Sequence, residues 1–164
     1  MKNILKQILS FILPVTVLVI VPLRIEKNRT IHISYSFLLG SILILSGLII
    51  MAFCISSFIR IGKGTLAPWS PTKKLVIKGL YRYVRNPMIL GVLIVLLGGA
   101  LIISSENILI WTGSFFMINT IYFIIYEEPN LEKRFGTEYR EYKKHVSMWI
   151  PRRIPYHPDQ SKKQ

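Results

Sequence analysis

The sequence predicts an all-α fold: a multi-pass transmembrane helical bundle of about four spans with an amphipathic carboxyl-terminal helix on the cytoplasmic side. Three observations predict it. Of the 164 residues, 51% are hydrophobic and 18% are charged, and the mean hydropathy is +0.44. The apolar residues gather in four long runs, and the basic residues behind the net charge of +13 lie mainly on one side of these runs. This composition excludes disordered and collagen-like chains and disfavours a soluble globular domain.

Each of the four apolar runs has the length of a membrane span. The runs cover residues 4–23, 35–59, 87–105 and 108–126. At about 1.5 Å per residue such a helix crosses a hydrocarbon core about 30 Å thick, and a helix satisfies its own backbone groups in lipid. Only Glu106 and Asn107 separate the last two runs, so we expect these spans to form a tight antiparallel hairpin. The whole chain, residues 1–164, is expected to form one domain.

The basic residues predict the orientation of the bundle. Of the 21 lysine and arginine residues, 18 lie near the amino terminus up to Lys6, in residues 60–86 or in residues 127–164. Because cytoplasmic loops carry the excess of basic residues, both termini and the loop 60–86 are expected in the cytoplasm. The segments 60–91 and 127–155 can therefore meet at one face of the membrane.

The segment 79–91 runs directly into the third span. Its proline, asparagine, basic and aromatic residues are more than a simple membrane anchor requires. Pro87 suits the first turn of a helix, which places Asn86 at the N-cap. The free N–H groups of a helix start can bind an anion. Interfacial anchoring is the open alternative, because basic side chains snorkel to headgroups and aromatic ones form belts. The residues concerned are Tyr81, Arg82, Tyr83 and Arg85.

An acidic doublet, Glu127 and Glu128, follows the fourth span and precedes Pro129. Two carboxylates at a membrane boundary are costly to desolvate and usually have a cationic partner. The alternative is a helix cap, in which Pro129 is the first helical residue and the acids face the positive end of the helix dipole.

An apolar stripe after the doublet predicts the amphipathic helix. Its members recur at helical spacing: Leu131, Phe135, Tyr139, Tyr142 and Val146. The opposite face carries Lys133, Arg134, Arg140, Lys143 and Lys144. Such a helix can lie against the inner leaflet or over the bundle, with a bend or break at Gly136, and simple surface attachment is the alternative.

Several familiar chemistries are missing from the sequence. It has no nucleophile elbow, no H-E-x-x-H pair and no P-loop, and its single cysteine, Cys54, lies inside the second span. We therefore expect neither a metal site nor a catalytic triad. Nucleic-acid binding is not expected either, because the basic residues follow the membrane topology.

Two motifs in combination point to a known family. One is an R-[HN]-P segment that opens a span, and the other is E-E-x-x-L-x-x-x-F-G-x-x-Y-x-x-Y after the next span. The residues that carry the resemblance as a whole are 64–69, Leu75, Val76, 79–91, Glu127, Glu128, Leu131, Phe135, Gly136, Tyr139, Tyr142 and Pro151. Over about residues 60–155 the chain resembles the isoprenylcysteine carboxyl methyltransferase family and, more loosely, phospholipid N-methyltransferases.

The resemblance implies an integral membrane enzyme that binds S-adenosylmethionine between helix ends and the carboxyl-terminal segment. It implies a cofactor site with one wall shaped by Leu75, Val76 and Tyr81, a cradle of Asn86, Pro87, Met88 and Ile89, and a carboxylate from Glu127 with Glu128 beside it. The chemistry agrees, because carboxylates suit the cofactor's sulfonium and ammonium, whereas helix N–H groups or Arg85 suit its carboxylate. The adenine could stack on Tyr81.

Three positions depart from the family pattern. Asn86 replaces the usual histidine, Ile89 replaces a tyrosine, and Phe123 replaces an arginine that faces substrate in the prenylcysteine enzymes. The last departure weakens the case for a prenylcysteine acceptor. The small size resembles a compact prokaryotic relative, which would lie in the cytoplasmic membrane.

The expected function is S-adenosylmethionine-dependent methyl transfer to a lipid-like or isoprenylcysteine-like acceptor that enters from the bilayer, with carboxyl O-methylation favoured. An ionised carboxylate needs no general base, so no catalytic residue is assigned. One alternative is an NADPH-dependent enzyme like the sterol reductases, which share a similar carboxyl-terminal plan. Another is a non-catalytic membrane adaptor whose basic tail recruits anionic lipid or a partner.

Overall fold

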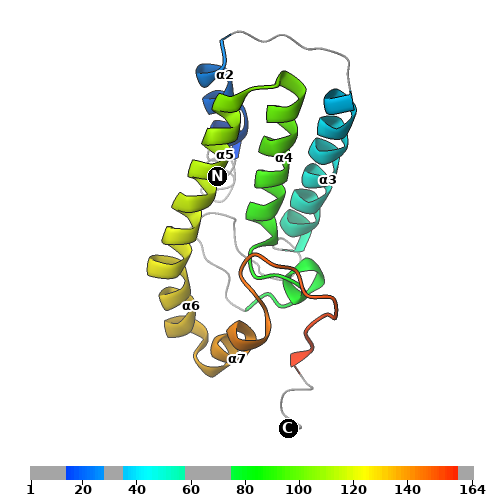
Figure 1. The fold of residues 1–164 in the computed structure, drawn as a ribbon. Coiled ribbons are helices and arrows are strands. Elements are labelled where there is room, and N and C mark those ends of the chain that lie inside the picture. The colour runs from blue at the N-terminus through cyan, green and yellow to red at the C-terminus, as the bar shows by residue number, and fades with distance from the viewer. Residues whose placement is uncertain (1–13, 28–34, 58–74, 159–164) are drawn as a thin grey trace, which may run out of the picture.

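The computed structural model describes residues 14–27, 35–57 and 75–158, and this part of the chain is helical and contains no strand, as the sequence predicts. Its elements are η1 (Thr16–Ile20), α2 (Val21–Ile25), α3 (Tyr35–Ser57), η3 (Gly79–Arg82), α4 (Pro87–Ile103), α5 (Glu106–Tyr122), η4 (Phe123–Glu127), α6 (Glu128–Phe135) and α7 (Thr137–His145). Figure 1 shows α3, α4 and α5 side by side, with α6, α7 and the carboxyl-terminal segment gathered at one end.

Two of the described helices are long and apolar enough to cross a membrane. They are Tyr35–Ser57 and the continuous helix Glu106–Phe135. The helices Thr16–Ile25 and Pro87–Ile103 are apolar but shorter. Of the predicted first span 4–23, the part before residue 14 lies outside the described residues, and so do residues 58–59 of the second span and residues 60–74 of the predicted loop.

Four glycines hold α3 and α4 close together. A Cβ atom on Gly40 would lie 2.6 Å from the carbonyl oxygen of Gly98, and a Cβ atom on Gly47 would lie 2.6 Å from the carbonyl oxygen of Gly91. The two contacts are seven residues apart on both helices, so they form a seam along one face of each. Small residues allow helix backbones to approach in a membrane, where dispersion contacts replace the hydrophobic driving force.

The connection between α4 and α5 is as short as the sequence predicts, but it is shifted. Ser104 ends α4 in the left-handed region, with φ of 51°, and Ser105 is the N-cap of α5. The Ser105 Oγ accepts a hydrogen bond of 3.2 Å from the backbone N–H of Ile108. Glu106 and Asn107, expected as the connection, belong to the first turn of α5 because the serine hydroxyl caps the helix.

The helix of the fourth span does not end at residue 126, as the sequence suggested. It continues through the π-helical turn η4 into α6, and the N–H of Glu128 bonds to the carbonyl of Phe123. Pro129 explains the wider turn, because a proline lacks an N–H and clashes with the carbonyl four residues earlier, at Ile125. The capping interpretation of the acidic doublet is therefore wrong, since the two acids lie inside a continuous helix.

The predicted carboxyl-terminal helix is divided into two helices at Gly136, where the sequence predicted a bend or a break. Gly136 separates α6 from α7 with φ of 57° and ψ of −127°, a conformation that favours glycine. The apolar stripe nevertheless stays together across the break. Leu131 and Phe135 of α6 pack against a buried cluster that contains Tyr139 and Tyr142 of α7.

Candidate functional site

A buried ion-pair cluster joins the start of α4 to α6 and α7. Arg85, just before α4, pairs through its NH1 atom with the Oε1 of Glu128. The other carboxylate oxygen of Glu128 lies 2.8 Å from the Nζ of Lys143, which also lies 2.9 Å from Glu132. The side chains of Arg85 and Glu128 are only 12% and 6% exposed. The two motifs that the sequence singled out therefore meet at one end of the bundle.

The carboxyl-terminal segment returns to this end and runs beside the stretch before α4. The N–H of Arg85 donates to the carbonyl of Ser147 at 3.0 Å, and the N–H of Arg152 donates to the carbonyl of Tyr83 at 2.9 Å. Figure 1 shows this orange-red segment lying against η3 below α4. The segment thus forms part of the wall around the ion pair.

Aromatic side chains fill the space between α7 and the returning segment. Tyr139, Tyr142, Val146 and Tyr156 are buried together with Ile77. Leu75 also packs against this cluster. The Tyr142 hydroxyl donates a 2.6 Å hydrogen bond to the carbonyl of Tyr81. These contacts tie α7 to the stretch that precedes α4.

Burial and neighbouring charges shift the pKa values of several groups in this region. Burial raises the pKa of Tyr81 well above its ordinary value and also raises the pKa of Tyr142. Burial and the charge of Glu128 raise the pKa of Tyr139. Hydrogen bonds to Glu128 and Glu132 raise the pKa of Lys143. The three tyrosines are therefore neutral and Lys143 is charged at neutral pH.

Two of the three residues expected to shape a cofactor wall, together with one residue of the expected cradle, lie in or beside one small buried cluster. Val76 and Tyr81 pack together with Cys54 of α3, and Met88 packs against the same group. Tyr81 is 8% exposed, so its ring supports the wall from inside rather than offering an open face to an adenine. Stacking on Tyr81 would require that the ring become uncovered.

Asn86 and Arg85 present buried donors without partners. Asn86 is the N-cap of α4 and Pro87 the first helical residue, as predicted, but the Asn86 side chain makes no capping bond. The Asn86 Nδ2 and the Arg85 Nε are buried and find no hydrogen-bond partner within the described part of the chain. A buried donor that stays unpaired is costly, so a ligand acceptor fits this position.

Neither Glu127 nor Ile89 takes part in the ion-pair cluster. Among the described contacts, Glu127 accepts a hydrogen bond of 3.4 Å from the Tyr122 hydroxyl and makes no ion pair. Ile89 packs against the buried apolar cluster that contains Met51 and Leu96. Glu127 is therefore a carboxylate whose charge the described residues leave uncompensated.

Sequence reasoning missed two parts of this region. Lys143 was assigned to the exposed basic face of α7, yet it completes the Glu128 ion pair. Trp149 was not considered, although its ring lies 5.1 Å from the Phe116 ring and 6.4 Å from the Phe123 ring. A tryptophan among basic and proline residues is a weak signal, and only the return of the chain brings it to α5.

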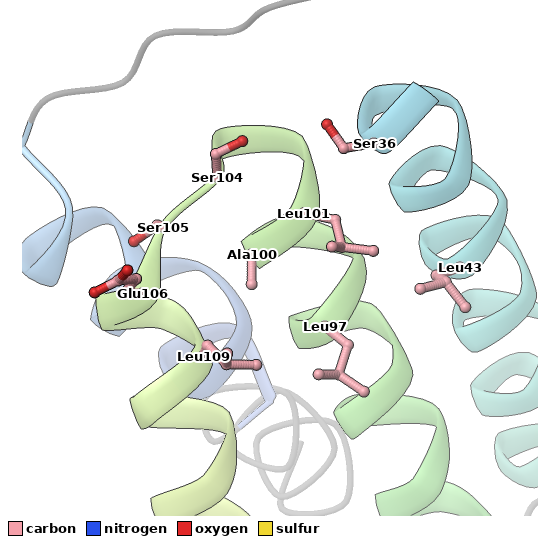
Figure 2. A pocket seen from close by; sticks show the side chains of 9 residues that line it. All are labelled: Ser36, Leu43, Leu97, Ala100, Leu101, Ser104, Ser105, Glu106 and Leu109. Carbon is pink, nitrogen blue, oxygen red and sulfur yellow. The ribbon is translucent and has the colours of Figure 1, made fainter. Parts of the chain in front are cut away.

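A pocket of about 410 Å³ lies at the opposite end of the bundle. Figure 2 shows Leu43, Leu97 and Leu109 lining it, with Ser104 and Glu106 at its rim. The whole of α4 separates this pocket from Asn86, a length of about 25 Å at 1.5 Å per residue. The pocket is therefore separate from the ion-pair cluster.

Comparison with known proteins agrees with the motifs. A family profile described as phospholipid methyltransferase matches residues 35–138, which is more than half of the chain. The chain belongs to the phospholipid methyltransferase family. This match includes both the segment before α4 and the acidic doublet.

A relative of the chain also carries a methyltransferase name. Methanethiol S-methyltransferase 1 of Bradyrhizobium diazoefficiens is 40% identical over 75 residues. The match covers 44% of this chain and 24% of the relative, so the chain matches about a quarter of that protein's length. No solved structure matches the chain significantly. The family profile and the named relative both place the chain among methyltransferases. Its apolar helices agree with a membrane location.

Proposed function

We propose that this protein transfers a methyl group from S-adenosylmethionine to a lipid-like acceptor that reaches the site from the bilayer. The observation that carries the proposal is the juxtaposition of unpaired buried donors at the start of α4 with the acidic doublet of the α5–α6 helix. The Arg85–Glu128 ion pair links the two. A zwitterionic cofactor needs both kinds of group in one place.

The donors at the start of α4 fit the carboxylate of the cofactor. The Asn86 Nδ2 and the Arg85 Nε lack partners, and the first N–H groups of α4 have none within the helix. A helix start favours an anion through these N–H groups and through the helix dipole. We assign Asn86, Pro87, Met88 and Ile89 to this cradle, with Ile89 holding it to the bundle core.

Glu127 fits the cationic part of the cofactor better than Glu128 does. Glu128 already holds Arg85 and Lys143, one on each carboxylate oxygen. Glu127 makes no such pair within the described residues. We therefore assign the cofactor contact to Glu127 and a positioning role to Glu128, which keeps Arg85 beside the cradle.

When bound, the cofactor supplies an electrophilic methyl group on a sulfonium. The protein's task in an in-line displacement is to align donor and acceptor, an effect worth up to about 7–11 kcal/mol. Leu75, Val76 and Tyr81 support the wall from within the protein core. An ionised carboxylate acceptor needs no general base, so carboxyl O-methylation is the favoured reaction.

A thiol is the second candidate acceptor. The relative with 40% identity is named for S-methylation of methanethiol. The position of the substrate-facing arginine in the prenylcysteine enzymes is Phe123, and its ring lies edge-on to Trp149. An apolar surface there suits a sulfur nucleophile as well as a lipid chain.

We further propose that four helices cross the membrane, with the candidate site and both termini on the cytoplasmic side. The two shorter apolar helices, Thr16–Ile25 and Pro87–Ile103, would complete the four spans together with the two long ones. In this topology the sequence assigns 18 of the 21 basic residues to the cytoplasmic side, as expected for a prokaryotic cytoplasmic membrane.

Thermal unfolding in detergent distinguishes the proposed methyltransferase from the two alternatives, an NADPH-dependent reductase and a non-catalytic membrane adaptor. A ligand at 100 times its dissociation constant stabilises the folded protein by about 2.7 kcal/mol. We expect S-adenosylmethionine to raise the unfolding midpoint and NADPH to leave it unchanged. Protection by NADPH alone would favour the reductase alternative, and protection by neither cofactor would favour the adaptor.

Radiolabelled methyl transfer identifies the acceptor atom. Membranes that contain the protein are incubated with methyl-labelled S-adenosylmethionine, and lipids are then extracted and treated with alkali. We expect labelled lipid whose label is released as methanol, as for a methyl ester. Label that resists alkali would indicate a thioether or an amine, and a lipid fraction without label would contradict a lipid-like acceptor.

A further inference from the structure

Two isoleucines outside the bundle helices are strongly exposed. Ile150 is 76% exposed and Ile154 is 72% exposed. Backbone hydrogen bonds at Ser147 and Tyr156 hold the segment that contains them to the stretch before α4. The Trp149 ring contacts Phe116 and Tyr156 is buried, so contacts with the protein flank this segment on both sides. Single exposed apolar residues are common, but two within five residues of one held segment indicate an apolar environment that covers them.

Trp149 fixes the depth of this segment relative to the membrane. Its ring contacts Phe116 of α5 and Phe123 of η4, which precede Glu127 by 11 and 4 residues. These separations correspond to about 16 and 6 Å along a helix. The ring therefore lies beside the apolar part of the long helix rather than beyond the acidic doublet, and Ile150 is the next residue.

The helix Glu106–Phe135 exposes apolar side chains near its contacts with Trp149. Ile121, Ile124 and Ile125 are 53%, 55% and 71% exposed, as expected for side chains that face lipid. Ile150 thus follows Trp149 in the chain at a level where the long helix exposes apolar side chains.

The charge of the segment suits a membrane interface. Residues 142–158 contain four lysines and arginines and no acidic residue. Arg153 stands between the two isoleucines in the chain and is exposed. Basic residues next to apolar ones favour an anionic lipid surface, with the apolar side chains below the headgroups.

We propose that residues 150–154 form a membrane-interface wedge, in which Ile150 and Ile154 enter the acyl region of the cytoplasmic leaflet and Arg153 contacts anionic headgroups. The wedge would hold the returning segment at the bilayer surface. Its occupant is lipid and not a second protein, because the segment lies at the depth of the lipid-facing helix surface. This inference does not depend on the cofactor or on the reaction.

Spin labels measure the depth of these positions directly. Cysteines replace Ile150 or Ile154 in a Cys54→Ala background, and the labelled protein is reconstituted into vesicles of phosphatidylcholine and phosphatidylglycerol at about three to one. Power saturation then compares accessibility to oxygen, which concentrates in lipid, with accessibility to a water-soluble nickel chelate. Ile121→Cys is the lipid reference, and Lys144→Cys, at a side chain that is 68% exposed on α7, is the aqueous reference.

We expect the labels at 150 and 154 to resemble the label at 121, with high oxygen and low nickel accessibility. Nickel accessibility equal to that at 144 would overturn the proposal, and so would protection from both reagents, which would indicate a covering protein. Both isoleucines are exposed, so their replacement removes little packing. A label at Pro151, which is also exposed, provides the same readout if either variant fails to fold.

Discussion

At the residue scale, two adjacent carboxylates have different surroundings. Glu128 is 5% exposed and holds two cations, whereas Glu127 is partly exposed and holds none among the described residues. The sequence predicted that the doublet needs a cationic partner, which Arg85 and Lys143 confirm for Glu128. It could not separate the two acids, because their directions depend on the wider helical turn before Pro129.

Replacement of Glu128 by alanine should destabilise the protein strongly. It would leave the buried Arg85 without its partner, and the loss of one partner from a buried pair costs about 3–5 kcal/mol. The control is Glu132→Ala, since Glu132 is 35% exposed and its pair with Lys143 is worth about 1 kcal/mol or less. Unfolding by denaturant in detergent measures both, and equal losses would contradict the buried role of Glu128.

Alkaline pH should loosen the region around α7. The pKa values of Tyr81, Tyr139 and Tyr142 are raised from 10.0 and that of Lys143 from 10.5. For each group the folded state binds its proton more tightly, so stability is fully present below these ordinary values and falls as the pH rises above about 10.

The measurement for this prediction is the thermal unfolding midpoint between about pH 8 and pH 11. We expect a flat profile up to about pH 10 and a decline above it. The slope should be smaller in Tyr139→Phe, which removes one titrating group. A midpoint that rises with pH across this window would contradict the assigned direction of the shifts.

At the element scale, the positions of the apolar helices along the chain were predictable, whereas several of their boundaries were not. Apolar runs located α3, α4 and α5 because a membrane span has a fixed length. The π turn at η4 and the serine cap of α5 moved the boundaries, because they depend on local hydrogen bonds. The sequence predicted a bend or a break at Gly136, and the positive φ of this glycine accompanies a break. The glycine seam was not predictable, because its contacts join glycines of α3 to glycines of α4 that are more than 40 residues away in the sequence.

Replacement of Gly47 by alanine should separate α3 from α4. The new methyl group would lie 2.6 Å from the Gly91 carbonyl oxygen, and such overpacking costs about 1–3 kcal/mol. Gly99→Ala is the matched control, because a Cβ atom there meets nothing within 4 Å and alanine favours a helix. The unfolding midpoint in detergent should fall for the first variant only, and similar midpoints for the two would contradict the seam.

At the scale of the whole molecule, the sequence predicted that the segment before the third span, 60–91, and the segment after the fourth span, 127–155, would meet. The Arg85–Glu128 pair confirms that the two segments meet. The return of residues 147–156 to the stretch before α4 was not predictable, because it rests on backbone hydrogen bonds between distant segments that leave no periodic pattern. This return encloses the candidate site and places Trp149 against α5.

Equilibrium binding of labelled S-adenosylmethionine to the purified protein tests the central claim most directly. We expect saturable binding to the wild type and to Glu141→Gln, an exposed acid whose nearest cation is Lys144, away from the Glu128 cluster. Glu127→Gln and Asn86→Ala should each weaken binding by about 10-fold or more while their unfolding midpoints stay near that of the wild type, since a lost hydrogen bond to a charged group costs about 1.5–3 kcal/mol. Absence of saturable binding to the wild type, or unchanged affinity in both variants, would contradict the account.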